Sequence, residues 1–92
     1  MIEKKFSITG TTGFAQPATM LVNVAHQFSS GIFLEYQGES VDLKQSPQSI
    51  MDILTLGIKT GTQFNIRVIG DDKVQAIQSI EEYLRRNKLI SH

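Results

Sequence analysis

The sequence predicts an α+β fold in which an antiparallel sheet is covered by helices on one face. Segments with the period of two typical of strands alternate with segments of helical period, in the order strand, helix, strand, strand, helix, strand, helix. The strand segments have one apolar face and one mixed or polar face, as in an antiparallel sheet covered on one side. With 92 residues and a hydrophobic content of 40%, the chain has room for one domain, residues 1–92, with a modest core.

The first two elements follow from the spacing of their apolar residues. Ile2, Phe6 and Ile8 alternate with polar residues, which predicts a strand with one buried face. In the next apolar segment, which begins at Pro17, the spacing is i, i+3, i+4 and i+7 and predicts one helical stripe, made of Leu21, Val24, Ala25 and Phe28. The run from Ser29 to Gly31 then predicts the end of this helix.

The rest of the chain continues the alternation. Residues 32–36 and 40–43 predict two strands joined by a tight turn at Gln37 and Gly38. A short helix over residues 49–56 and a fourth strand over residues 63–68 follow. Asp72, with Gln75 three residues later, predicts a capping box at the start of the last helix. The residues of that helix expected to face the core are Val74, Ile77, Ile80 and Leu84.

Composition narrows the classes of function. Nine basic and nine acidic residues give a formal net charge of zero, so we expect neither nucleic acid nor an anionic membrane as a partner. The chain has no cysteine, which excludes disulfides and thiolate chemistry, and we expect no metal and no cofactor. No apolar run approaches the roughly 18 residues of a membrane span. Because no signal-peptide core follows Met1 either, the sequence predicts a cytoplasmic protein.

The loop between the first strand and the first helix is the segment around which we expect function to be organised. It contains Gly13-Phe14-Ala15-Gln16-Pro17. Pro17 suits the first helical position, where its missing N–H has no partner to lose and its φ angle is already helical. Free backbone N–H groups at a helix N-terminus attract anions, so the loop is a candidate phosphate site.

Together with residues 49–58, which read Ser-Ile-Met-Asp-Ile-Leu-Thr-Leu-Gly-Ile, this loop resembles HPr, the small phosphocarrier of the bacterial sugar phosphotransferase system. The resemblance extends over nearly the whole chain. It implies an open-faced sandwich, in which a four-stranded antiparallel sheet carries three helices on one face.

The loop departs from the HPr pattern at the residue that carries the chemistry. In the family it runs Gly-Ile-His-Ala-Arg-Pro-Ala, and the His carries the phosphoryl group. Here the loop is one residue shorter, so the His is either deleted after Phe14 or replaced by Phe14, and the uncharged Gln16 stands in the place of the Arg. His26 lies roughly 13 Å further along the predicted helix and cannot replace the missing His. The segment from Gly13 to Pro17 is therefore predicted to be a degenerate phosphate loop without a catalytic residue.

The second segment matches a motif that carries a regulatory Ser in HPr proteins of low-GC Gram-positive bacteria. The resemblance makes Ser49 the candidate phosphoacceptor. Ser46 is the second choice, because Ser46 and Pro47 suit the start of a helix that begins one turn earlier. Asp52 replaces the motif's Gly, and its charge would repel a phosphate on Ser49. Two other interpretations stay open: Ser49 and Asp52 form a capping pair, or Asp52 mimics the phosphorylated state.

By resemblance, a set of apolar residues falls on or near the face that HPr proteins use to dock partners. These residues are Phe14, Met20, Ile50, Met51 and Leu54. Methionine adapts to contact surfaces, and a clustered exposed apolar patch usually marks binding. The partners that the resemblance implies are enzyme I, enzyme IIA, HPr kinase/phosphorylase and the catabolite control transcription factor.

The sequence thus predicts a non-enzymatic HPr-like regulatory or adaptor protein of the phosphotransferase system or of carbon catabolite repression, with Ser49 as a candidate phospho-switch. One alternative is a phosphocarrier that accepts phosphate from enzyme I at a non-standard residue. The other is an orphan binding paralogue with an unrelated partner. The neutral Gln16 favours this second alternative, because an acidic partner surface would lose an ion pair there.

Overall fold

The computed structural model describes residues 1–8, 15–44, 48–59 and 61–86, and its elements follow in the predicted order. Alternating side chains form the strands, and apolar stripes of helical period form the helices. The bounds are β1 Ile2–Ser7, α1 Ala15–Ala25, β2 Gly31–Tyr36, β3 Glu39–Asp42, α2 Gln48–Leu56, β4 Gln63–Ile69 and α3 Lys73–Arg86.

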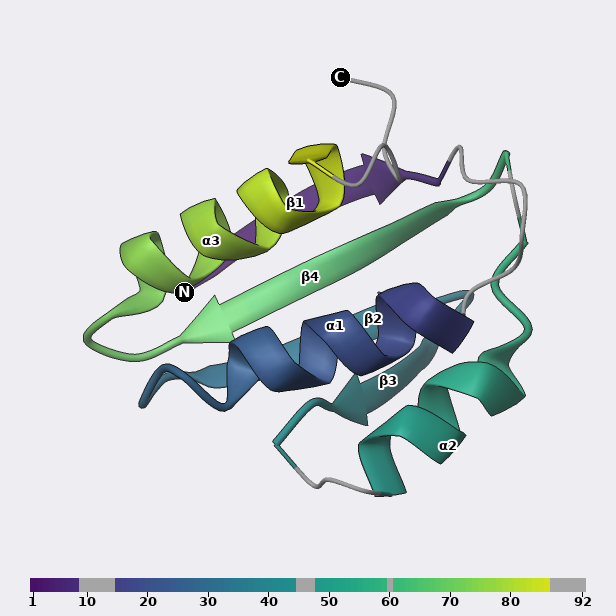
Figure 1. Ribbon diagram of the computed structural model, residues 1–92, viewed down its shortest axis with the longest axis horizontal. Coiled ribbons are helices and arrows are strands. Elements are labelled where there is room, and N and C mark those ends of the chain that lie inside the picture. The colour runs from purple at the N-terminus through teal and green to yellow at the C-terminus, as the bar shows by residue number, and fades with distance from the viewer. Residues whose placement is uncertain (9–14, 45–47, 60, 87–92) are drawn as a thin grey trace.

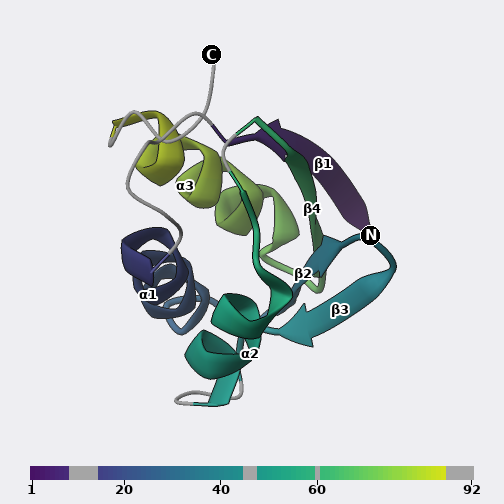
Figure 2. The same ribbon diagram turned by 90° about the vertical axis from the view of Figure 1, so that its right-hand side faces the viewer.

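The four strands form one antiparallel sheet in the order β1-β4-β2-β3. β4 is an interior strand, and its Val68 lies opposite Ile2 on β1 and Ile32 on β2. All three helices lie on one side of this sheet, and no described element covers the other side (Figure 1 and Figure 2). The predicted open-faced α+β sandwich is therefore confirmed.

The β2–β3 hairpin has the predicted turn. Gln37 and Gly38 both adopt positive φ angles, 51° and 84°, as a two-residue type I′ turn requires. Glycine tolerates this region because it has no Cβ. The turn fixes the register, with Leu34 opposite Val41, and this register places the apolar residues of both strands on the covered face of the sheet.

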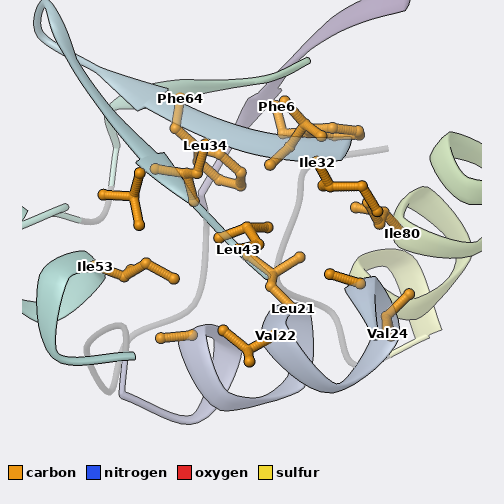
Figure 3. Close-up of a cluster of buried hydrophobic side chains, with 14 of the residues drawn as sticks. Phe6, Leu21, Val22, Val24, Ile32, Leu34, Leu43, Ile53, Phe64 and Ile80 are labelled. Atoms are coloured by element: carbon orange, nitrogen blue, oxygen red, sulfur yellow. The ribbon is translucent and has the colours of Figure 1, made fainter. Parts of the chain in front are cut away.

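The core lies between the sheet and the helices (Figure 3). Each element contributes the residues that its period places on the inner face. The largest side chains that are almost completely buried include Phe6, Leu21, Ile32, Leu34, Leu43, Ile53, Phe64, Ile66, Ile80 and Leu84. The rings of Phe6 and Phe64 lie opposite each other on β1 and β4, with their centroids 5.8 Å apart.

Two expectations for helix positions were wrong. α1 ends at Ala25, so Phe28 is not helical and packs, half-buried, against the core from the following turn. In α3, Val74 is 47% exposed, and Ala76 is buried in its place. The reason is helical geometry: Ala76, Ile80 and Leu84 succeed one another in steps of four, whereas Val74 lies about 200° around the helix from Ala76.

Asp72 precedes α3 as expected, and its carbonyl accepts a hydrogen bond of 2.9 Å from the Ala76 N–H. The expected capping box is wrong, because the Asp72 carboxylate bonds to the α1–β2 connection instead. Asp72 Oδ2 accepts hydrogen bonds from the backbone N–H of Ser29 at 2.9 Å and from its hydroxyl at 3.3 Å. Asp72 Oδ1 accepts them from the backbone N–H of Ser30 at 2.9 Å and from the Ser30 hydroxyl. These bonds, with that of the Ser30 hydroxyl foremost, lower the pKa of Asp72 from 3.8 to about 2.

Candidate functional site

α1 begins at Ala15, so Ala15, Gln16 and Pro17 are its first three residues. Pro17 is thus the third helical residue and not the first, as the sequence had suggested. The first four N–H groups of a helix lack intrahelical partners, so proline is tolerated anywhere in that turn. Gly13 and Phe14 lie outside the described residues. The last three residues of the predicted phosphate loop therefore form the start of α1.

His26 lies at the other end of α1. It follows the last helical residue, Ala25, is exposed, and donates its backbone N–H to the carbonyl of Val22 at 3.2 Å. The 11 residues of α1, at about 1.5 Å of rise each, place it roughly 16 Å from the start of that helix. His26 and the loop therefore lie too far apart to act on the same phosphate.

Ser49 is the second residue of α2, and its side chain is completely buried. Its hydroxyl donates a hydrogen bond of 2.6 Å to the backbone carbonyl of Asp42, the last residue of β3. In an antiparallel ladder, successive residues point their backbone groups alternately toward and away from the paired strand. Because Leu43 N–H bonds the Ile32 carbonyl on β2, the Asp42 carbonyl points away from β2, toward α2. Ser49 thus ties the first turn of α2 to the edge of the sheet.

The burial of Ser49 bears directly on its predicted modification. A phosphoryl group on the Ser49 hydroxyl would need the first turn of α2 to separate from β3, since this oxygen has no solvent-exposed surface in the folded chain. Phosphorylation of Ser49 stays a prediction, with this opening as its requirement. The second choice, Ser46, lies outside the described residues.

Asp52 is half-buried, and its Oδ1 accepts a hydrogen bond of 2.9 Å from Nε2 of Gln48, one turn earlier in α2. This contact joins a carboxylate to a neutral amide, and it leaves the charge of Asp52 at the surface of the helix. The capping interpretation paired the side chains of Ser49 and Asp52. In the structure Asp52 bonds Gln48, and the Ser49 hydroxyl bonds β3.

The five apolar residues expected on the docking face differ in exposure. Met51 is 60% exposed and Leu54 is 42% exposed, so α2 presents two neighbouring apolar side chains to solvent. Met20 on α1 and Ile50 on α2 are half-buried, and Ile50 packs against the core. Phe14 lies outside the described residues. Since α1 packs against α2, we define Met51, Leu54 and the exposed part of Met20 as the α1–α2 face.

Sequence reasoning did not predict which residues fix α2 in place. Ile53 is completely buried, and Ser49 bonds β3 from the same side of the helix, so the outer side of α2 is held at a defined orientation. The spacing of Ile53 was a signal for burial. The position of Ser49 gave no signal for burial, because a polar side chain in the first turn of a helix is equally compatible with a cap.

Two further findings concern the described residues. None of the three helices combines the length and apolar character needed to cross a membrane. Residues 1–8, 15–44, 48–59 and 61–86 contain no group of three or more acidic or His side chains arranged to hold a metal ion.

The described elements together define a small α+β protein of the HPr type: an open-faced sandwich with the short α2 packed beside α1. Comparison with protein families gives the same result. The family described as "PTS HPr component phosphorylation site" matches residues 2–86, and the chain therefore belongs to the HPr family.

Solved structures of HPr proteins resemble the chain over almost its full length. The histidine-containing phosphocarrier protein of Mycoplasma is 34% identical, with a TM-score of 0.87, and the match covers 99% of this chain and 100% of that one. HPr of Bacillus anthracis is 32% identical, with a TM-score of 0.75 and coverage of 89% and 94%.

A catabolite-repression relative also matches. Crh of Bacillus subtilis, described as a domain-swapped dimer, is 29% identical, with a TM-score of 0.65 and coverage of 94% of this chain and 91% of that one. The family thus includes phosphotransferase-system carriers and a catabolite-repression protein, whose partners in general are proteins of these systems.

Proposed function

We propose that this chain is a non-enzymatic HPr-like regulatory or adaptor protein of the phosphotransferase system or of catabolite repression, which acts in the cytoplasm. The observation that carries the proposal is the composition of the segment that leads into α1 and forms its first three residues: residues 9–17 contain neither His nor Cys. A carrier needs a nucleophile whose phosphoryl bond stays reactive, and the threonines of this segment have no neighbouring base in the sequence. A protein with this loop docks partners without passing phosphate on.

The α1–α2 face supports the docking part of the proposal. Met51 and Leu54 are exposed on a helix that Ile53 and Ser49 hold in a fixed orientation. A rigid pair of adaptable or branched apolar side chains lowers the entropy cost of binding, because little has to become ordered on contact. Phe14, Met20 and Ile50 complete the proposed contact set. The proposed partners are enzyme I, enzyme IIA, HPr kinase/phosphorylase and the catabolite control transcription factor.

The first experiment separates docking from phosphoryl transfer. The purified protein is incubated with phosphoenolpyruvate and enzyme I, and its intact mass is measured. We expect no mass gain, while titration calorimetry with each of the four proposed partners finds binding to at least one. An acid-labile gain of about 80 Da would contradict the proposal and favour a carrier with a non-standard phosphoacceptor.

A variant pair then tests the surface. Replacing Met51 and Leu54 together by Ala should weaken partner binding by about tenfold or more, since central apolar contacts dominate interface energies. Val74→Ala is the matched control, because Val74 is similarly exposed but lies on α3. Equal binding by the double variant and the control would show that the partner docks elsewhere.

Regulation by phosphorylation is tested with ATP and HPr kinase/phosphorylase. We propose Ser49 as the phosphoacceptor and Ser46 as the second choice. A gain of about 80 Da that disappears in Ser49→Ala, or in Ser46→Ala, identifies the residue. The absence of any gain would leave a constitutive binding module. In that case the carboxylate of Asp52, which is held by Gln48, would provide a permanent negative charge at this helix.

An orphan paralogue with an unrelated partner is the second candidate, and the neutral Gln16 at the start of α1 favours it. A loop-restored variant, with a His inserted after Phe14 and Gln16→Arg, tests it. Phosphoryl transfer from enzyme I to this variant would mean that the docking face is intact. If the variant receives no phosphoryl group although its circular dichroism spectrum matches that of the wild type, the docking face itself has diverged, and the orphan role is supported.

A further inference from the structure

Charge is unevenly distributed in this neutral chain. From residue 39 to residue 58, the segment that contains β3 and α2, the sequence has three acidic residues, Glu39, Asp42 and Asp52, and one basic residue, Lys44. The Lys44 ammonium donates a hydrogen bond to the backbone carbonyl of Phe28, so it is directed to the connection between α1 and β2. The surface of β3 and α2 is thus acidic.

A groove of about 200 Å³ lies between β3 and α2. Glu39 and Ser40 of β3 and Asp52 and Thr55 of α2 contribute polar groups to its walls, and Val41 and Leu56 contribute apolar ones. Glu39 is exposed, and among the described residues it has no basic partner. Asp52 has only the neutral amide of Gln48 as its partner there. Neither carboxylate of the groove forms a salt bridge with a described residue.

The same helix turns carry the exposed apolar pair. Met51 and Thr55 are one turn apart, as the hydrogen bond from the Thr55 hydroxyl to the Met51 carbonyl shows, so Met51 borders the groove. Leu54 lies about 100° around the helix from Thr55, on the other side of Met51. An apolar contact site is therefore flanked by a groove that favours cations. No positively charged side chain of α2 or β3 competes for it, because neither element contains one.

From this juxtaposition we infer the chemistry of the protein that docks on α2: a segment with an apolar side chain beside a Lys or Arg. The apolar side chain lies on Met51, with Leu54 beyond it, and the cation enters the groove between Glu39 and Asp52. The inference rests on the proposed docking function and adds the sign of charge that the partner must present. Complementary charge at the edge of an apolar contact raises the association rate and selects between partners.

Two synthetic peptides test the inference without a physiological partner. Both are amphipathic helical peptides of about twelve residues with Leu on one face; one carries Arg beside the Leu residues, and its twin carries Glu at the same positions. Binding is followed by NMR of the 15N-labelled protein. The Arg peptide should bind at least about fivefold more tightly than the Glu peptide, the scale expected for two exposed ion pairs. The shifted amides should include Glu39, Ser40, Asp52 and Thr55.

Charge reversal provides the control. The double variant Glu39→Lys and Asp52→Lys should lose or invert the preference for Arg. The matched variant Glu3→Lys and Asp71→Lys changes the net charge equally at exposed positions outside β3 and α2 and should keep the preference. Raising the salt concentration from about 0.05 to 0.5 M should remove the preference in the wild type, because exposed charges are screened. This arm does not depend on how the variants fold.

The inference is overturned if the Glu peptide binds as tightly as the Arg peptide, or if both double variants change the preference equally. Its failure is distinguishable from that of the proposed function. Discrimination between the peptides without binding to any of the four proposed partners would refute the proposed function alone. Binding of such a partner with the same affinity to the wild type and to Glu39→Lys, Asp52→Lys would refute the inference alone.

Discussion

The bond from Ser49 to β3 gives a sharp test of how α2 is held. In Ser49→Ala, the Asp42 carbonyl loses a buried donor at 2.6 Å. A buried acceptor without this partner costs about 1–3 kcal/mol. Ala regains about 0.5 kcal/mol over Ser through its higher helix propensity. We therefore expect the free energy of unfolding to fall by about 0.5–2.5 kcal/mol, and each kcal/mol lowers Tm by roughly 4–8 °C in a domain of this size.

The matched control is Thr55→Ala, which removes another hydroxyl from the same helix. The Thr55 hydroxyl donates to the Met51 carbonyl at 2.9 Å, but Thr55 is exposed, so water can replace the bond. Its unfolding free energy should stay within about 0.5 kcal/mol of the wild type. Urea denaturation followed by circular dichroism measures both variants. If Ser49→Ala is as stable as Thr55→Ala, the hydroxyl does not hold α2 on the sheet, and Ser49 is more accessible to a kinase than its burial suggests.

Three further predictions concern stability. The folded-state pKa of Asp72, about 2, lies below its usual 3.8, so its hydrogen bonds contribute stability above pH 4 that is lost as the pH falls toward 2. The Tm difference between the wild type and Asp72→Asn should therefore narrow over that range. A constant difference would show that the charge of the Asp72 carboxylate does not stabilise the fold. Gly70→Ala should destabilise the fold by about 2 kcal/mol or more, because its φ is 148° and a Cβ would lie 2.4 Å from Oγ of Ser30; an unchanged Tm would show that this turn moves freely. Ile53→Ala should cost about 2–5 kcal/mol and Leu54→Ala about 1 kcal/mol or less, because Ile53 is completely buried and Leu54 is 42% exposed; equal losses in urea denaturation would contradict the orientation of α2.

The sequence alone determined the faces of the strands and the position of the hairpin. Ile32, Leu34 and Tyr36 recur at every second position, as Val41 and Leu43 do, and Gln37 with Gly38 suits a two-residue hairpin turn. A period of two or 3.6 residues is a local property, so it can be read without knowing what each face contacts. The missing loop His was visible in the same way, because it depends on composition and not on packing.

Only the tertiary structure decided which polar side chains serve local helix ends and which join distant segments. Asp72 and Ser49 both stand where a cap is expected, yet the Asp72 carboxylate bonds Ser29 and Ser30, more than 40 residues earlier, and the Ser49 hydroxyl bonds the edge of β3. A carboxylate or hydroxyl at a helix start has donors and acceptors available both in its own turn and across the core, at similar cost. The arrangement of the helices on the sheet selects between them, and that arrangement is set by burial of the whole apolar surface, which no single segment of sequence contains.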